Sequence, residues 1–175
     1  PMISLEGRRF WVLGLMPLSR TGILRSKFVL SSAAAVLVSG SLICLSDRML
    51  DVPGWMMALH AGMVILVGLG LSGLSVGLGA MFPDFRTDNP SRIVSSFGGT
   101  LNLLLGLAYL LGVTALMALP VCLREVPRLF GSYGLSDLTF GAGLACASAA
   151  SLLLTGLATW VPLRLGEKAL ERAEL

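Results

Sequence analysis

The fold is decided by the stretch WMMALHAGMVILVGLGLSGLSVGLGAMF, residues 55–82, which contains no Asp, Glu, Lys or Arg. Three further stretches share this property, Phe28–Ser46, Ile93–Leu123 and Leu138–Leu163. A helix rises about 1.5 Å per residue and the hydrocarbon core of a bilayer is roughly 30 Å thick, so about 20 residues span it once. Helices are the expected spanning element, because the alternating pattern of a membrane barrel is missing. The sequence therefore predicts an all-α polytopic membrane bundle of four transmembrane helices.

The composition fits a membrane protein. Hydrophobic residues make up 55% of the 175 residues and charged residues only 13%, whereas about a quarter of the residues in a soluble domain are charged. No basic patch large enough for nucleic acid is present. Because Cys44, Cys122 and Cys146 form no CxxC pair, we expect buried free thiols rather than a zinc site or disulfides, and no cofactor. The chain begins with Pro1 and shows no signal-peptide pattern, so we expect further residues upstream.

The distribution of Lys and Arg predicts the orientation, because cytoplasmic loops carry an excess of positive charge. We expect both ends of the chain and the loop between the second and third spans to be cytoplasmic, in the cell membrane. The predicted segments are a cytoplasmic interfacial segment at 1–27, a four-helix domain at 28–163 and a cytoplasmic tail at 164–175. The cytoplasmic set is Arg8, Arg9, Arg20, Arg25, Lys27, Arg86, Arg92, Arg164, Lys168 and Arg172, and the opposite set is Arg48, Arg124 and Arg128.

Local signals mark the expected helix boundaries. Asn89 followed by Pro90 is typical of an N-cap with proline at the first helical position, and Ser136 with Asp137 is a similar cap for the last span. The outer segment from Pro120 to Tyr133 is interrupted by Pro and Gly. We expect this segment to be a broken or partly re-entrant element rather than a plain extension of the third span.

Two rows of small residues favour close approach of helices. Gly73 and Gly77 lie on one face of the second span, and Ala142, Cys146 and Ala150 lie on one face of the fourth. We expect both rows to pack within the chain, with a dimer face as the alternative.

The most distinctive stretch precedes the first span and reads ISLEGRRFWVLGLMPLSRTGILRSK, residues 3–27. The part before Pro17 is too short to cross a bilayer, and it carries Arg8 and Arg9 beside apolar residues, which is typical of a helix lying along the membrane interface. Ser19 then caps a new helix, whose basic residues reach toward the lipid headgroups. We expect this helix to continue as the first span.

This pattern resembles the first cytoplasmic coupling loop of the ABC-2 type permeases. That loop has an acidic residue with Gly, an apolar half-helix, Pro, a small residue, and then Ile-Leu and Lys. The matching residues in this chain are Glu6, Gly7, Leu13, Pro17, Ser19, Ile23, Leu24 and Lys27. Within that superfamily the chain is most similar to the ABC exporter membrane subunits, also through the second cytoplasmic loop with Pro83, Asp84, Asp88, Asn89 and Pro90.

The resemblance implies the permease subunit of an ATP-driven exporter, with the four spans corresponding to the third to sixth of six. It implies that residues 6–27, including Arg8 and Arg9, couple to a separate ATPase subunit. Membrane lipid and a second permease copy are the other expected partners. Asn102 and Tyr109 in the third span are candidates for substrate contact, although polar side chains in bundles often bond a neighbouring helix instead. The alternative function is a membrane scaffold or assembly subunit without transport.

Catalytic motifs give little support for an enzyme. The chain has no G-x-x-x-x-G-K-[ST] loop, so we expect ATP hydrolysis only in a partner. The spans carry no acidic or basic residue that could couple transport to ions. Gly70-Leu71-Ser72-Gly73 matches the nucleophile motif of rhomboid-type proteases, yet the single histidine, His60, lies about 18 Å away along the same helix. We expect Ser72 to be a packing residue and His60 to lie near the membrane interface.

Overall fold

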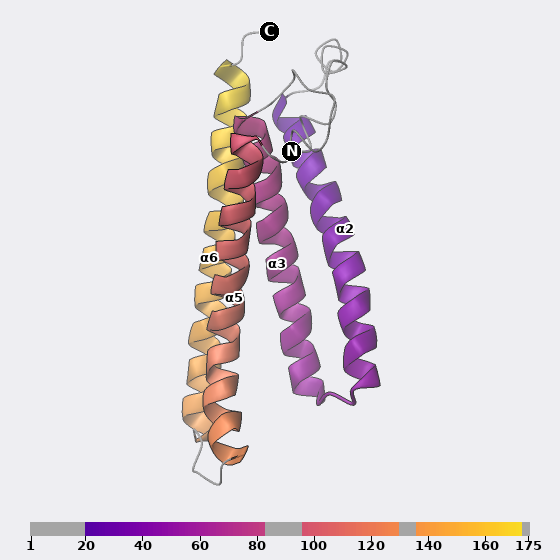
Figure 1. Cartoon of the computed structure of the whole chain (residues 1–175), viewed down its shortest axis with the longest axis vertical. Coiled ribbons are helices and arrows are strands. Elements are labelled where there is room, and N and C mark those ends of the chain that lie inside the picture. Colours follow the sequence, from indigo (N-terminus) through magenta and orange to yellow (C-terminus); the bar gives the residue numbers. More distant parts are fainter. Residues whose placement is uncertain (1–19, 83–95, 130–135, 173–175) are drawn as a thin grey trace.

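The computed structural model describes residues 20–82, 96–129 and 136–172, and these form four long helices (Figure 1). The predicted all-α fold with four membrane-spanning helices is confirmed. The expected interfacial helix before Pro17 lies outside the described residues. The helices are α2 (Arg20–Met49), α3 (Gly54–Met81), α5 (Phe97–Leu129) and α6 (Asp137–Arg172).

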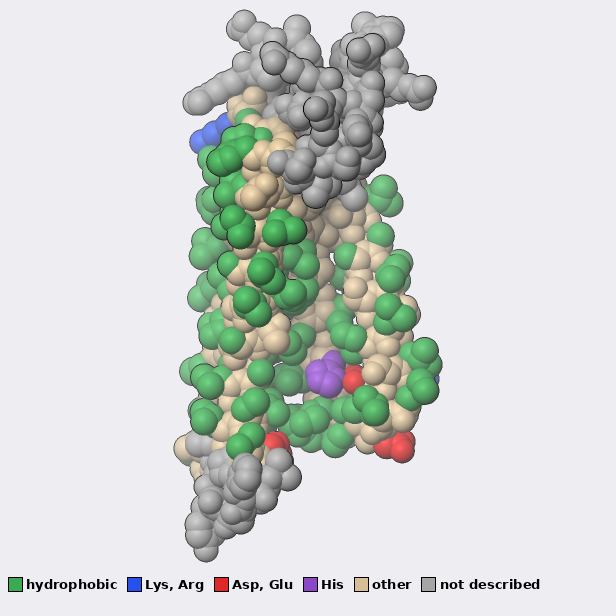
Figure 2. Space-filling view, in the orientation of Figure 1, with side chains coloured by type: hydrophobic (Ala, Val, Ile, Leu, Met, Phe, Trp, Pro, Cys, Tyr) green, Lys and Arg blue, Asp and Glu red, His purple; other side chains and the backbone are tan. Residues whose placement is uncertain are grey.

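Each of these helices is long and apolar enough to cross a membrane. The apolar segments contain between 28 and 33 residues, which exceeds the roughly 20 that a bilayer requires. Apolar side chains cover the face drawn in Figure 2 along most of its length, and charged side chains gather toward its two ends. Because a soluble protein rarely exposes so large an apolar surface, the chain is a multi-pass membrane protein.

The helices alternate in direction, so helix termini collect at two ends of the bundle (Figure 1). We call one of them the terminal end. It carries the start of α2, the end of α3 at Met81, the start of α5 at Phe97 and the end of α6. The opposite end, the far end, carries Met49, Gly54 and Asp137. Two clusters of buried side chains occupy the interior, one around Val76 and one around Val113, and each of these two residues has no exposed surface.

α3 is the central helix of the bundle. Of the 18 most apolar consecutive residues of α3, 56% are buried inside the bundle, compared with 6% for the corresponding stretch of α2. A Cβ atom added to Gly73 would lie 2.6 Å from the Cα atom of Thr159 in α6, and one added to Gly77 would overlap the backbone of Pro162. α3 and α6 therefore touch backbone to backbone, and the predicted packing of the Gly73 and Gly77 row within the chain is confirmed.

Two other packing predictions are wrong. Ala142 and Cys146 on α6 are exposed and Ala150 is only half-buried, so this row does not face the described helices. All three cysteines, Cys44 and Cys122 as well as Cys146, are exposed instead of buried. The physical reason is that lipid is as apolar as a protein interior, so a small apolar side chain gains little by turning inward.

The prediction that the segment from Pro120 to Tyr133 is a broken or partly re-entrant element is wrong for its described part, because α5 continues without interruption to Leu129. Pro120 is buried in the contact with α6, where Gly143 leaves room for its ring. Neighbouring helices tolerate proline within membrane spans, since local adjustments pair the freed carbonyl group. Residues 130–133 of the predicted segment lie outside the described residues.

Serine side chains cap two of the helices. The Oγ atom of Ser136 accepts a hydrogen bond from the backbone N–H of Thr139 at 3.4 Å, which confirms the predicted cap of α6. Ser96 holds the same position on α5, where its Oγ accepts the N–H of Gly99 at 3.4 Å. The cap predicted at Asn89 lies outside the described residues.

Candidate functional site

The first turns of α2 are inserted into the core at the terminal end. Leu24 is only 1% exposed and packs in one cluster with Val76 and Ala80 of α3. Phe28 and Leu163 pack against the same cluster, so α6 also takes part. The start of α2 is therefore packed closely against both α3 and α6. We call this buried contact of Leu24 the joint, and Leu24 itself has almost no exposed surface.

The neighbouring residues of α2 lie at the surface of this joint. Ile23 and Lys27 are half-buried. The Arg25 guanidinium lies 3.8 Å from the Glu167 carboxylate on α6, but its side chain is 78% exposed, so solvent screens this ion pair and it contributes little. The remaining predicted coupling residues lie outside the described residues: Glu6, Gly7, Arg8, Arg9, Pro17 and Ser19 of the first loop, and Pro83, Asp84, Asp88, Asn89 and Pro90 of the second.

Tyr109 connects three helices in the middle of the bundle. Its hydroxyl donates a hydrogen bond to the Leu66 carbonyl of α3 at 2.7 Å and lies 2.8 Å from the Thr155 hydroxyl of α6. Its ring covers Gly70, where any side chain would overlap it. Tyr109 is 5% exposed, so it bonds neighbouring helices, as polar residues in bundles often do. Asn102, the other candidate on α5, is half-buried.

Replacing Tyr109 with Phe removes this hydroxyl while it keeps the ring over Gly70. We expect the free energy of unfolding to fall by about 1 kcal/mol, because the hydrogen bonds of the buried hydroxyl to Leu66 and Thr155 are lost. Titration of the purified protein with SDS, followed by circular dichroism, measures this change. A double-mutant cycle with Thr155→Val should show coupling of about 0.5 kcal/mol or more. Independent effects of the two substitutions would contradict the proposed link between α5 and α6.

The serine of the protease-like motif does not meet the histidine. Ser72 is buried, and its Oγ accepts a hydrogen bond from Ser31 of α2 at 3.3 Å. His60 lies twelve residues earlier on α3, about 18 Å along the helix axis, and bonds a different residue. Ser72 therefore contributes to the packing of α2 on α3, as the sequence predicts.

Asp47 and His60 form a pair that joins α2 to α3 near the far end and that the sequence pattern does not indicate. The Nδ1 atom of His60 lies 2.9 and 3.1 Å from the two carboxylate oxygens of Asp47. When the carboxylate is ionised it can only accept hydrogen bonds, and this contact then requires the proton on Nδ1. Asp47 is 5% exposed. The apolar run in the sequence ends at Ser46, one residue before Asp47, whereas α2 continues to Met49.

A second set of polar and aromatic contacts joins three helices at the far end. Arg124 of α5 donates to the Asp137 carboxylate of α6 at 2.8 Å, and its guanidinium lies 4.3 Å from the centroid of the Phe140 ring. Phe140 in turn meets Trp55 of α3 edge to face, with the ring centroids 5.9 Å apart. α3, α5 and α6 are thereby held together at this end by one continuous set of contacts.

Comparison with known proteins supplies a family for this four-helix chain. The matching family is described as "Putative ATP-binding cassette", and the match covers residues 1–175. No curated protein and no solved structure matches the chain. The matched region includes all four membrane-spanning helices, the joint at Leu24 and the Asp47–His60 pair. The chain therefore belongs to this family and is related to the ABC transporters.

Proposed function

We propose that this chain is the transmembrane, or permease, part of an ATP-driven ABC-type exporter of the ABC-2 kind. It lines the substrate pathway, and a separate ATPase subunit hydrolyses ATP. The support is the combination of four spanning helices, a whole-chain match to an ABC-related family, and a sequence without a G-x-x-x-x-G-K-[ST] phosphate loop. Its other partners are membrane lipid and a second copy of the permease, and Asn102 is the candidate substrate contact.

The observation that carries this proposal is the joint at Leu24. A permease driven from outside needs a cytoplasmic segment whose displacement moves the spans. Here Leu24, which lies near the end of the coupling-loop pattern, is packed against Val76 and Ala80 of the central helix. An ATPase that pushes on residues 6–27 would therefore act on α3 and α6 as well as on α2. A membrane anchor without a lever role does not require such a buried connection.

Purification of the full-length protein from its own membrane tests the proposal. The expected result is co-purification of an ATP-binding cassette ATPase, with ATP hydrolysis that depends on the presence of the permease. The alternative, a scaffold or assembly subunit without transport, predicts membrane partners but no such hydrolysis. Recovery of the intact protein without an ATPase, from a membrane that contains one, would contradict the proposal.

The proposed orientation gives a second prediction, because the terminal end carries the excess of Lys and Arg and should face the cytoplasm. In a variant without native cysteines, a cysteine at Arg128 should react with a membrane-impermeant maleimide in intact cells. A cysteine at Arg86 should react only after the membrane is opened, and the difference should be at least tenfold because the bilayer excludes the reagent. Labelling of the Arg86 position in intact cells would reverse the orientation and remove the basis for the coupling loop.

A further inference from the structure

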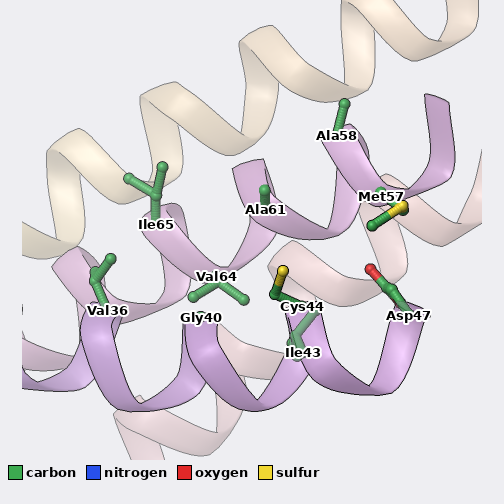
Figure 3. Close-up of a pocket in the computed structure, with 10 residues that line it drawn as sticks. All are labelled: Val36, Gly40, Ile43, Cys44, Asp47, Met57, Ala58, Ala61, Val64 and Ile65. Carbon is green, nitrogen blue, oxygen red and sulfur yellow. The ribbon is translucent and has the colours of Figure 1, made fainter. Parts of the chain in front are cut away.

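A cavity of about 410 Å³ lies between α2 and α3, beside the Asp47–His60 pair (Figure 3). Figure 3 shows Val36 at one end of the group of lining residues and Asp47 at the other. Val64 and Ile65 of α3 line the apolar part, and Met57 lies across from Asp47. Cavities that bind small molecules in proteins have volumes of about 300–1,000 Å³ and are lined mostly by apolar side chains with a few polar groups.

Asp47 is the only charged residue among those that line this cavity. Its carboxylate is buried, and among the described residues its side-chain partner is the imidazole of His60, with no Lys or Arg paired to it. One imidazole N–H uses only part of the acceptor capacity of a carboxylate, which has about four lone-pair sites. A buried carboxylate is stable only when it is paired and hydrogen-bonded. His60 already supplies one such partner, and the remaining acceptor sites of the Asp47 carboxylate are complementary to a ligand that carries a cation.

The shape of the site specifies the rest of the ligand. Val36 and Asp47 are eleven residues apart on one helix, which corresponds to about 16 Å along its axis. The charged group stands in the last turn of α2, at the far end, while the apolar walls extend toward the middle of the bundle. A molecule bound here would hold its cationic head near the membrane interface and its apolar body within the membrane.

We infer that this cavity binds a cationic amphiphile, a single-chain or compact apolar body that carries an ammonium group, with Asp47 as the counter-ion. His60 does not line the cavity and acts as a positioning residue, because its Nδ1–H holds the carboxylate in place. A two-chain aminophospholipid presents the same ammonium chemistry but is much larger than a cavity of this size. The inference goes beyond the proposed function, since binding requires neither an ATPase nor transport.

Photoaffinity labelling of the full-length protein in dodecyl maltoside tests this inference. The probe is a long-chain alkylamine with a diazirine on its chain, and mass spectrometry identifies the labelled peptides. We expect labels on the segments that contain Val36, Val64 and Ile65. Dodecylamine should compete with the probe, whereas dodecanol, which has the same chain without the charge, should compete at least tenfold less, because a charge-assisted hydrogen bond is lost. Competition by phosphatidylethanolamine but not by dodecylamine would overturn the assignment to a free amphiphile.

Three substitutions distinguish the contribution of the Asp47 charge from the contribution of the cavity volume. Asp47→Asn keeps the shape of the side chain but removes its charge, and it should reduce labelling at least tenfold. Ala61→Trp fills the cavity from α3 without altering Asp47 and should abolish labelling even if Asp47→Asn fails to fold. Gly62→Ala, at a position with open space around it, is the control and should label like the parent. Unchanged labelling in a folded Asp47→Asn protein, or in Ala61→Trp, would overturn the inference.

Discussion

Gly77→Ala is expected to separate α3 from α6 and to lower the free energy of unfolding by about 2–3 kcal/mol. A methyl group at this position would overlap the backbone of Pro162, which cannot rotate away as a flexible side chain can. The two helices must therefore move apart along this backbone contact. SDS titration of the purified protein measures the loss, and size-exclusion chromatography reports whether the remaining protein is compact.

The matched control is Gly156→Ala, the same change on α6 at a position with open space around it. Because alanine is the better helix former by about 1 kcal/mol, this control should be neutral or slightly stabilising. The comparison isolates the backbone contact from the general effect of adding a methyl group. If both variants unfold at the same SDS fraction, α3 and α6 do not approach each other as described here.

If the proposed function is right, Glu6→Lys, made in the full-length protein together with its ATPase partner, is expected to uncouple the two subunits. Reversal of a charge in a close interface replaces an attraction with a repulsion, so association with the ATPase should weaken roughly tenfold or more. Substrate-stimulated hydrolysis should fall in parallel, while membrane insertion and expression stay unchanged. Pull-down of the ATPase and measurement of phosphate release report the two effects separately.

Arg48→Glu is the control for this substitution, because it also reverses a charge but lies on an exposed position in the last turn of α2, at the far end. It should leave ATPase association within about twofold of the parent, since surface substitutions away from specific contacts change free energies by no more than about 0.5 kcal/mol. Equal losses in Glu6→Lys and Arg48→Glu would show that charge alone, not its position, governs the interaction.

The helical spans could be predicted from the sequence because a bilayer imposes a minimum apolar length. That constraint also limits what the pattern reveals about helix ends. α2 runs past Ser46 to Met49, and α5 runs through Pro120 to Leu129, because a helix can continue beyond its apolar part wherever neighbouring helices or water satisfy the backbone. The apolar pattern thus marks the membrane-embedded part of a helix better than its end.

Helix packing was easiest to predict where two backbones must touch. The spacing of Gly73 and Gly77 indicates a close approach, which the structure confirms against α6. The row with Cys146 has the same spacing but faces outward, because within a membrane an apolar face has little preference between protein and lipid. The Asp47–His60 pair was missed because it depends on how α2 and α3 are placed side by side, which neither segment specifies alone.

Site-specific photo-crosslinking in intact cells tests the central claim, that an ATPase acts on this chain through residues 1–27, most directly. A photoreactive amino acid at Arg8 or Arg9 of the full-length protein should capture a subunit that contains an ATP-binding cassette, and the same group at Arg48 should not. Failure to capture an ATPase from any position in residues 1–27, in a protein that is correctly inserted in its own membrane, would contradict the account.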